Sequence, residues 1–365
     1  MKIIYWIGID DHADKWTIAQ YRGEEERPSK EFELVPDEKG YRRLLSHLKS
    51  LKGEVRIVYE AGPCGYELYR RLTKAGYWCR VAAPALTPCK PGERVKTNRR
   101  DAAKLGRYLR SNDLTFVVVP DDERESLRDL LRARESVQKD IGRVRKQIIH
   151  LLLRYGHRYR KGQAWTARFW SWLKTIELAG AHSRFVLDEM VGELEHRLLQ
   201  LKRYDEQVEI ASQKPEYQPY LAGLRTLRGI NTLSAMTILS ELGDLRRFAT
   251  APQLMAGVGV VPSEYSTGDK TNRFAITKTG NAHVRRIAVE AAWQYQRRPL
   301  HGRIITARRK DQSKQIVDIA ERCEKRLHSK FHRMTSRNKK STVAVVAVAR
   351  ELLGFIWAIG NIAHL

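Results

Sequence analysis

The sequence is poor in cysteine and in acidic residues. Its four cysteines, Cys64, Cys79, Cys89 and Cys323, form no CxxC pair and stand at no ligand spacing from a histidine, so we expect neither a zinc site nor a disulfide framework. The 365 residues include 42 Asp and Glu against 67 Lys and Arg, which leaves a net charge of +25. A surface this basic is typical of proteins that bind polyanions, and nucleic acid is the expected partner. The alternative is a basic soluble protein without such a partner.

Long hydrophobic runs and a cleavable leader are also missing. The N-terminus shows no charged lead followed by a long apolar run and a small-residue cleavage site, so we expect no secretory signal. The most apolar stretch, residues 341–360, is interrupted by Arg350 and Glu351, so we expect no membrane-spanning helix. No GxGxxG turn follows the first predicted strand, which argues against a dinucleotide-binding fold. We therefore expect a cytoplasmic protein.

Residues 1–120 carry alternating strand and helix patterns. Two β-rich runs are separated by the polar residues "DHAD", as in a hairpin, and a third short run can add a strand. Helix and strand patterns then alternate as far as residue 120, which predicts an α/β domain of the ribonuclease H and resolvase type. The predicted strands are residues 3–10, 15–21, 31–35, 55–62, 77–84 and 114–120, and the predicted helices are residues 37–51, 64–76 and 100–111.

Residues 121–214 contain two helical seams. Most seam residues are apolar and repeat at 4-3 spacing from Leu130 to Leu151 and again from Leu187 to Val208. This spacing predicts either a coiled-coil hairpin or paired helices between subunits. The residues between the seams, 163–178, are aromatic and basic. Two interpretations of them stay open: they stack on bases, or they form a hydrophobic tip that closes the hairpin or contacts a partner subunit.

The sequence of residues 215–340 predicts a mainly helical domain whose C-terminal segment is basic. A helix, a turn at Gly229 and a second helix open it, and such a turn either points N–H groups at a phosphate or is an ordinary helical turn. A glycine- and hydroxyl-rich loop then leads into a helix from Asn281. Residues 297–340 hold 15 Lys and Arg against 4 Asp and Glu, and we interpret them as a phosphate-binding surface. Residues 341–365 are predicted to form a C-terminal helix that packs on the body of the protein.

Three acidic residues stand at the edges of predicted elements in the first domain. Asp10 ends the first strand, Glu60 ends the strand that starts near Val55, and Asp101 opens a helix. In a resolvase-type fold these places face one cleft, and convergent carboxylates can hold Mg²⁺ for phosphoryl transfer on nucleic acid. Asp11 follows Asp10 directly and is expected to point away from it as a solvated neighbour.

Five segments of the sequence resemble, in order, the successive blocks of the insertion-sequence 110 transposases. They are "YWIGIDDHADKW", "IVYEAGPCGYELYRRL", "RVKTNRRDAAKLGRYL", "LRTLRGINTLSAMTILSELGDLRRF" and "GVVPSEYSTGDK…ITKTGNAHVRR". The resemblance extends over essentially the whole chain. That family comprises DEDD-type recombinases, which are related to the pilin-gene inverting recombinases and act with a bridge RNA.

The resemblance implies a domain plan and a reaction. Residues 1–120 would be a resolvase-like domain, residues 121–214 a coiled-coil dimerisation segment, and residues 215–340 a transposase domain followed by the helix at 341–365. The protein would recombine donor and target DNA, with a bridge RNA pairing to both. An acidic cluster would bind Mg²⁺, and a serine would form a covalent phosphoserine intermediate with DNA. The helical seams predict homodimers, and the need to hold two DNAs together suggests that these assemble into a tetramer.

Carried over residue by residue, the acidic pattern falls on Asp10, Glu60, Asn98 and Asp101. Asn98 is a departure, because an amide oxygen can coordinate a hard cation but brings no negative charge. The expected metal ligands are therefore Asp10, Glu60 and Asp101, with a lower affinity than four carboxylates would give. Asn98 also fits as the N-cap of the helix that contains Asp101.

The nucleophile position is the second departure. The family's serine precedes a glycine, whereas here Thr267 precedes Gly268 and Ser266 stands one place earlier. Thr267 can act as a nucleophile, although its branched Cβ crowds the approach, and a slip of the loop by one residue would give the role to Ser266. A member that has lost catalysis also stays open.

Cations near both predicted sites are expected to hold the nucleic-acid backbone. Such contacts stabilise phosphate charge and are not sequence-specific. The alternative for each of them is a solvated helix charge. The candidates are Lys96, Arg99, Arg100, Lys270, Arg273, Lys278, Arg285 and Arg286.

Two other function classes stay open. A metal-dependent junction nuclease would use water as its nucleophile and form no protein–DNA adduct. A nucleic-acid-binding regulator derived from a transposase would bind without cutting.

Overall fold

The computed structural model describes residues 3–88, 97–267, 270–300 and 302–363. The chain forms two compact units, residues 1–120 and residues 121–365. The boundary follows Pro120, where the alternation of strands and helices gives way to helices.

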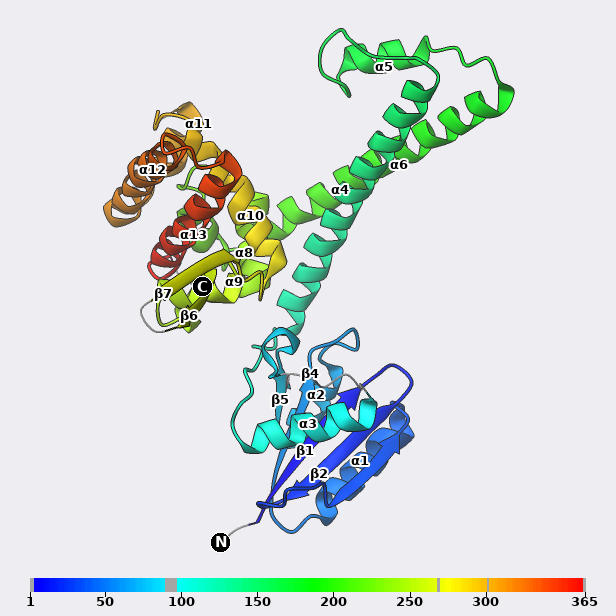
Figure 1. Cartoon of the computed structure of the whole chain (residues 1–365), viewed down its shortest axis with the longest axis vertical. Coiled ribbons are helices and arrows are strands. Elements are labelled where there is room, and N and C mark those ends of the chain that lie inside the picture. Colours follow the sequence, from blue (N-terminus) through cyan, green and yellow to red (C-terminus); the bar gives the residue numbers. More distant parts are fainter. Residues whose placement is uncertain (1–2, 89–96, 268–269, 301, 364–365) are drawn as a thin grey trace. The chain divides into compact units, whose positions relative to one another are not determined.

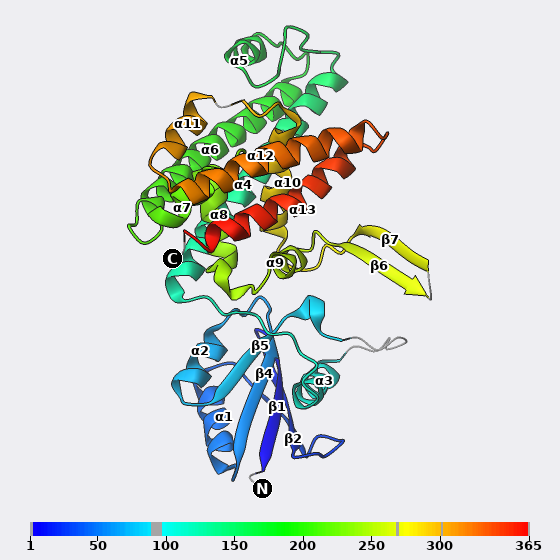
Figure 2. The same ribbon diagram turned by 90° about the vertical axis from the view of Figure 1, so that its left-hand side faces the viewer.

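A five-stranded mixed sheet with helices on both faces forms the first unit (Figures 1 and 2). Its elements are β1 (Ile4–Asp11), β2 (Trp16–Arg22), β3 (Lys30–Leu34), α1 (Glu38–Ser50), β4 (Glu54–Glu60), α2 (Glu67–Lys74), β5 (Trp78–Ala82), a 3-10 turn (Pro84–Leu86) and α3 (Asn98–Arg110). The strand order is β3-β2-β1-β4-β5, with β2 antiparallel to β1 and β3, and β4 parallel to β1 and β5. This order is consistent with the predicted ribonuclease H and resolvase type. The predicted strand 114–120 is wrong, because it makes only one bridge, between Phe116 and Ala82.

Side-chain alternation along the strands gives the sheet two apolar faces. Ile7, Ile9 and Ile57 are fully buried on the face that α1 and α2 cover. Trp6 and Val58 are buried on the opposite face, where they pack with residues of α3.

Gly8 allows α3 to lie directly on β1. A Cβ atom at this position would come within 2.5 Å of the Gly106 backbone nitrogen and closer still to the Ala102 carbonyl oxygen. Both atoms belong to the helix backbone and cannot rotate away. The glycine therefore fixes how near the first turns of α3 come to the sheet.

We expect Gly8→Ala to lower the free energy of unfolding by about 1–3 kcal/mol, because the added methyl group pushes α3 away from β1. Gly142→Ala is the matched control, since a Cβ atom there meets nothing within 4 Å and α4 (Asp122–Arg154) gains a better helix former. Urea unfolding of both variants measures the difference. Equal midpoints would show that the close approach of α3 is dispensable.

Helices dominate the second unit (Figure 1). Its elements are α4 (Asp122–Arg154), α5 (Ala167–Lys174), α6 (Ala181–Ser212), α7 (Gln218–Leu224), α8 (Thr232–Leu242), a 3-10 turn (Leu245–Arg247), α9 (Ala251–Val258), β6 (Pro262–Thr267), β7 (Lys270–Ile276), α10 (Ala282–Ala292), a 3-10 turn (Trp293–Gln296), α11 (Arg303–Lys310), α12 (Lys314–Thr335) and α13 (Ser341–Gly360).

The two long helices α4 and α6 pack against each other in opposite directions. Arg134 of α4 bonds to Asp205 of α6 at 2.8 Å, and Arg143 further along α4 bonds to the earlier Glu193 at 2.9 Å. Seam residues that the sequence indicated, such as Ile141 and Leu194, are buried between them. The pairing therefore forms within one chain, as a helical hairpin.

α5 and its flanking loops close the far end of this hairpin (Figure 1). Phe169 of α5 is fully buried, and Leu173 and Ile176 are nearly so. They join the cluster that contains Ile148 and Leu187 of the long helices. The aromatic segment at 163–178 thus supplies the hydrophobic closure, one of its two predicted roles.

The core of the second unit is built around α13. Val348, Leu352 and Ile356 are completely buried and pack with residues of α8 and α10. In length and composition α13 could cross a membrane, the one helix among the described residues of which this is true, and half of its apolar window is buried inside the protein. Glu351, which interrupts the apolar run, bonds to Arg326 at 2.7 Å and to Lys330 at 2.5 Å. The predicted packing of the last helix on the body is confirmed.

The glycine-rich region before α10 differs from the predicted loop. It forms the antiparallel strands β6 and β7, in which Ser266 pairs with Thr271 and Thr267 with Lys270. The predicted turn at Gly229 is present, and its φ of +84° requires glycine. Gly229 lies against the Ala291 backbone, where a Cβ atom would come within 2.6 Å of the carbonyl oxygen.

Candidate catalytic and nucleic-acid site

The carboxyl ends of β1 and β4 bring two of the predicted acids side by side. Ile9 pairs with Tyr59 in the parallel register of these strands, so Asp10 and Glu60 are the next residues along each. Both follow the alternation that places Gly8 and Val58 on the α3 side of the sheet. Thr17 of β2 is opposite Asp10, and its hydroxyl is buried without a hydrogen-bond partner among the described residues. Oxygen donors therefore gather at this sheet edge.

The neighbouring residues of Asp10 have different contacts. His12 Nε2 lies 3.4 Å from Asp10 Oδ2, an ion pair when the imidazole is protonated. The Asp11 carboxylate accepts a hydrogen bond from Trp16 Nε1 at 2.8 Å, on the opposite side of β1. Burial raises the pKa of Asp11, against the opposing effect of the Trp16 bond. Asp11 points away from Asp10 as predicted, but it is a half-buried structural partner of Trp16 and not a solvated neighbour.

The start of α3 places Asp101 in its first turn. The N-cap is Thr97, whose Oγ1 accepts a bond from the Arg100 backbone nitrogen at 3.3 Å. The prediction of Asn98 as the cap is wrong, and Asn98 is the first helical residue. Its side chain is therefore not used in capping. The carboxylate of Asp101 lies in the first turn, where the positive end of the helix dipole stabilises a negative charge.

The described side chains do not gather into a closed metal site. Among residues 3–88, 97–267, 270–300 and 302–363, no three His, Cys, Asp or Glu residues form a group that could hold a metal ion. Asp10, Glu60 and Asp101 are included in this finding. The oxygen donors at the sheet edge are of the kind that Mg²⁺ prefers. Because they do not form a closed group, the ligand set stays a prediction.

The cations predicted beside α3 differ in their surroundings. Arg99 is exposed and its Nε lies 3.5 Å from Glu31 Oε2 of β3. Arg100 is exposed, and its backbone nitrogen bonds to the Thr97 cap. Lys96 lies outside the described residues.

Ser266 and Thr267 are the last two residues of β6. The structure places their backbone at the end of the β6–β7 hairpin, directly before residues 268–269, which lie outside the described residues. The side chains of these two residues, and those of Lys270 and Arg273, also lie outside what is described. Their proposed roles therefore rest on sequence position.

Of the other predicted cations of this region, Arg285 and Arg286 have contacts within the protein. Lys278 is exposed and has a φ of +56°. Arg285 donates to the Val258 carbonyl oxygen at 2.7 Å, which ties α10 to the end of α9. Arg286 bonds to Glu290 at 2.8 Å and to Glu135 at 3.0 Å. Phosphate binding by Arg285 or Arg286 would have to compete with these bonds.

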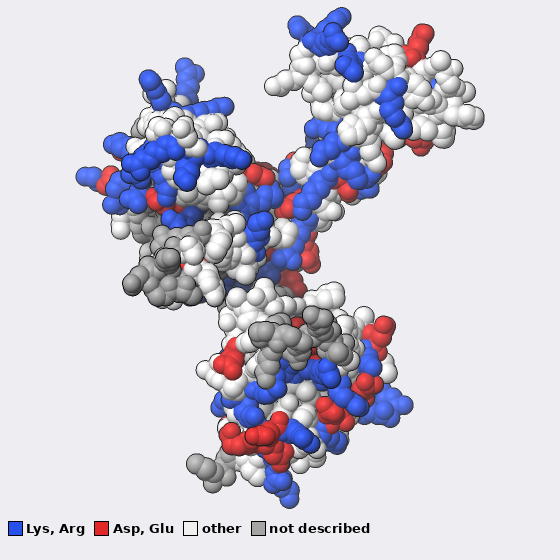
Figure 3. Space-filling model, viewed as in Figure 1, with Lys and Arg blue, Asp and Glu red and all other residues white. Residues whose placement is uncertain are grey.

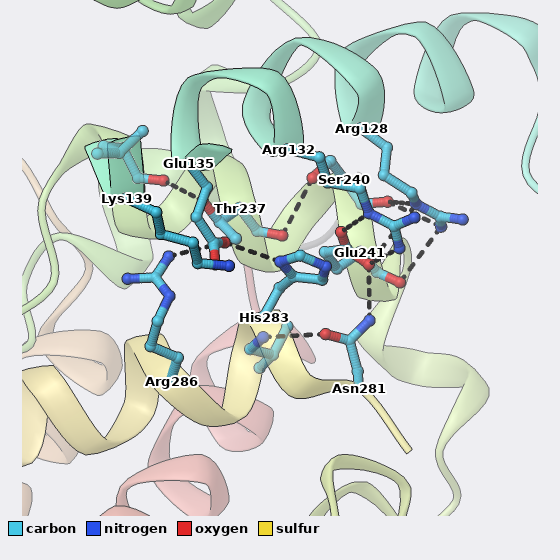
Figure 4. A network of polar contacts seen from close by, with 12 residues as sticks. Arg128, Arg132, Glu135, Lys139, Thr237, Ser240, Glu241, Asn281, His283 and Arg286 are labelled. Carbon is cyan, nitrogen blue, oxygen red and sulfur yellow. Dashed lines mark hydrogen bonds and ion pairs between the residues drawn. The ribbon is translucent and has the colours of Figure 1, made fainter. Parts of the chain in front are cut away.

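Two buried acids that sequence reasoning missed connect the hairpin to the domain that carries β6 and β7 (Figure 4). Glu135 of α4 is 9% exposed and bonds to His283 Nδ1 at 2.8 Å and to Lys139 at 2.7 Å. Burial acts to raise the pKa of Glu135, but hydrogen bonds from Lys139, His283 and Arg286 outweigh it and lower the pKa to about 2. The carboxylate thus stays charged between α4 and α10.

Glu241 at the end of α8 is the second of these acids. Arg132 binds its two oxygens at 2.7 and 2.9 Å, and Asn281 Nδ2 donates at 2.6 Å (Figure 4). Burial acts to raise the pKa of Glu241, and the bonds from Arg132 and Asn281 lower it overall. Asn281 also caps α10 by accepting from the Val284 nitrogen at 2.9 Å. The signal in the sequence was a carboxylate within an apolar helical run, which indicates a buried partner.

The predicted basic segment forms part of the surface of the second unit. Lys and Arg side chains gather over α11 and α12 (Figure 3). Exposed members are Arg303, Lys310, Lys314, Arg322, Lys325 and Arg333. Such a surface attracts a polyanion and gives no base specificity.

Comparison with known families gives two matches along the chain. A family described as "Transposase", of the DEDD type, matches residues 7–157, and a family described as "Transposase IS116/IS110/IS902 family" matches residues 222–304. The first range begins within β1 and contains β2 to β5, α1 to α3 and the whole of α4. The second contains α8, the β6–β7 hairpin and α10.

Individual relatives extend the similarity across the chain. The "Putative transposase y4qE" of Sinorhizobium fredii is 39% identical over 334 residues, 91% of this chain and 82% of the relative. The "Transposase for insertion sequence element IS1533" of Leptospira borgpetersenii is 30% identical over 352 residues, 93% of this chain and 99% of the relative. The "Transposase for insertion sequence element IS1328" of Yersinia enterocolitica is 25% identical over 252 residues, 66% and 71% of the two chains.

Proposed function

Since the chain belongs to the IS116/IS110/IS902 family of transposases, an enzyme family that acts on DNA in transposition, we propose that it cuts and rejoins donor and target DNA through a covalent protein–DNA intermediate. The observation that carries the proposal is the match of both regions that hold the predicted chemistry, with transposase relatives spanning most of the chain.

The acidic edge of the first unit is the proposed metal site. Asp10 and Glu60 would hold Mg²⁺ together with Asp101, and the amide oxygen of Asn98 can add a neutral ligand. The neighbouring positions of Asp10 and Glu60 on parallel strands, and the position of Asp101 in the first turn of α3, support this assignment. When bound, the ion would neutralise charge on the scissile phosphate. Three carboxylates instead of four would lower its affinity.

The proposed nucleophile is the hydroxyl of Thr267 or of Ser266. Its oxygen forms a bond to the scissile phosphorus while the phosphorus–oxygen bond to the leaving DNA strand breaks. The nucleophile loses its proton and the leaving strand oxygen gains one. The number of phosphodiester bonds is unchanged, so attack by another strand's hydroxyl can rejoin DNA without an external energy source.

Cations around the two sites would hold the DNA backbone. The proposed set is Lys96, Arg99 and Arg100 near α3, with Lys270, Arg273 and Lys278 near the β6–β7 hairpin. Arg285 and Arg286 stay in the set as secondary members, because each also bonds to groups of the protein.

Sequence choice would be delegated to a bridge RNA that pairs with donor and target DNA, while the protein contacts backbones. The high net positive charge supports binding of such polyanions. We further propose that the helical hairpin is a coiled coil through which homodimers form, and that two dimers make the tetramer that joins two DNAs in the cytoplasm. The proposed domains are residues 1–120, 121–214, 215–340 and 341–365.

The test is to trap the adduct on labelled DNA with co-purified RNA and Mg²⁺. We expect an adduct with the wild type, and its loss in either Thr267→Ala or Ser266→Ala, which identifies the nucleophile. Cleavage that survives in the double variant without any adduct would instead support a junction nuclease that uses water. Binding without cleavage in the wild type would support a catalytically lapsed regulator.

A further inference from the structure

The sequence between Asp140 and Glu177 contains no acidic residue. These 36 residues hold nine Lys and Arg and six aromatic residues. Cationic surface interleaved with aromatic rings is the composition of sites for single-stranded nucleic acid, where phosphates meet cations and bases stack on rings. From residue 158 onward the segment lies outside both family matches.

The aromatic rings of this segment leave some surface open at the end of the hairpin. Tyr159 and Trp172 lie 5.1 Å apart between ring centroids, and both contact the buried Phe169, at 5.2 and 5.3 Å. Phe169 has no exposed surface, whereas Tyr159 and Trp172 are only half-buried. The inner ring closes the hairpin, and the two outer rings keep surface available to a ligand.

A pocket of about 520 Å³ opens beside these two rings. Its lining includes His157, Arg158, Tyr159, Arg160 and Trp172, together with apolar residues of the C-terminal end of α4. Pockets of this size hold small ligands such as one nucleotide. Cationic side chains at the rim and rings at the wall match the two parts of a nucleotide, its phosphate and its base.

Among the described residues, the cations beside the pocket have no acidic partners. Arg158 and Arg160 line the pocket, and Lys161 follows them in the sequence. All three are exposed, and in the part of the chain that the structure describes none of them forms an ion pair. Other arginines of the hairpin do have acidic partners, as Arg143 has Glu193 and Arg184 has Asp188. The positive charge at the rim is therefore available to an external anion.

We propose that the end of the helical hairpin binds single-stranded nucleic acid, with one unpaired base in the pocket beside Tyr159 and Trp172. The flanking phosphates contact Arg158, Arg160 and Lys161. A duplex does not fit this role, because its bases are already stacked and paired. An RNA loop and a displaced DNA strand share the required chemistry. The inference goes beyond the proposed reaction and needs none of its steps.

Photocrosslinking locates the ligand directly. The full chain carrying Ser266→Ala and Thr267→Ala, which removes both proposed nucleophiles, is irradiated with a 12-nucleotide RNA or DNA containing 5-iodouracil, and the adduct is mapped by mass spectrometry. We expect adducts on Tyr159 or Trp172. Crosslinks with both oligonucleotides indicate recognition of backbone and base, and crosslinks with RNA alone indicate an RNA ligand. Crosslinks found only elsewhere in the chain overturn the proposal.

Charge removal tests the rim with a matched control. Arg158→Ala, Arg160→Ala and Lys161→Ala together are expected to lower the crosslink yield at the pocket about 10-fold. They should also reduce the slope of log binding constant against log salt concentration by about two, since each phosphate contact to a single strand contributes about 0.7 to that slope. The control removes three exposed cations, Arg43, Lys49 and Lys52 of the first unit, and should leave the pocket yield unchanged. Equal yields in the two triple variants overturn the proposal.

The aromatic wall is tested by Trp172→Leu, which keeps an apolar side chain but removes the stacking surface. We expect a loss of single-strand affinity of about 10-fold at this site, restored by Trp172→Phe. Far-ultraviolet circular dichroism checks that both variants keep their helices. Unchanged crosslinking in Trp172→Leu contradicts the inference. If the oligomeric mass changes and the crosslinking does not, the end of the hairpin is a protein contact.

Discussion

We expect Asp10→Asn to reduce Mg²⁺-dependent DNA cleavage by about 10³-fold or more, and Asp11→Asn to retain it. The expected difference comes from the strand geometry, because these adjacent residues point to opposite sides of β1. An amide at position 10 removes one of three negative charges from the proposed metal site. An amide oxygen at position 11 can still accept the bond from Trp16 Nε1, so the fold keeps its contact.

Cleavage of labelled DNA over a range of Mg²⁺ concentrations measures both variants, with RNA present. Glu60→Gln should behave as Asp10→Asn does, because Glu60 follows the paired residue Tyr59 on β4. Thermal melts establish that the inactive proteins are folded. An active Asp10→Asn, or an Asp11→Asn that is as inactive as Asp10→Asn, would show that the sheet edge is not the catalytic metal site.

We expect Glu135→Gln to lower the free energy of unfolding of the second unit by about 3 kcal/mol at neutral pH. The cationic or donor groups of Lys139, His283 and Arg286 surround this buried carboxylate. The glutamine removes the negative charge that compensates them. The pKa of Glu135, about 2, lies below its ordinary 4.5. A depressed carboxyl pKa contributes stability that is fully present above pH 4.5 and is lost as pH falls toward 2.

The difference between wild type and Glu135→Gln should therefore shrink between pH 4.5 and pH 3. Urea unfolding at pH 7, 4.5 and 3 measures it. The matched control is Glu206→Gln on α6, because Glu206 is exposed and its pair with Lys202 spans 3.9 Å, so the expected effect is below about 0.5 kcal/mol at every pH. A constant difference from pH 7 to pH 3 would mean that the charge of Glu135 is not what links α4 to α10.

Much of the first unit could be predicted because its signals are local. The alternation of apolar residues in β1 and β4 indicated strands that end at Asp10 and Glu60, and the structure ends both strands at or next to these residues. The side of β1 on which Asp11 lies follows from the same alternation. Residues 114–120 look as strongly β-like but gain only the bridge between Phe116 and Ala82 beside the edge strand β5, and the sequence pattern alone does not show how far that pairing extends.

The start of α3 shows where local signals compete. Thr97 and Asn98 stand side by side, and either side chain can cap a helix. Thr97 takes the extended conformation of a cap, with φ of −143° and ψ of 145°, and Asn98 enters the helix. Which residue caps depends on where α3 must begin in order to lie on Gly8, and that contact joins residues far apart in the sequence.

The sequence by itself determined the family, the alternation of strands and helices in the first unit as far as α3, the acidic strand ends and the net positive charge that favours nucleic-acid binding. Only the tertiary structure decided which charges are used inside the protein. Glu135 and His283 are 148 residues apart in sequence and 2.8 Å apart in space, and Arg286, predicted to hold DNA, bonds to the same carboxylate. The physical reason is that burial leaves a charge stable only beside its partner, and chain packing, not local pattern, chooses that partner.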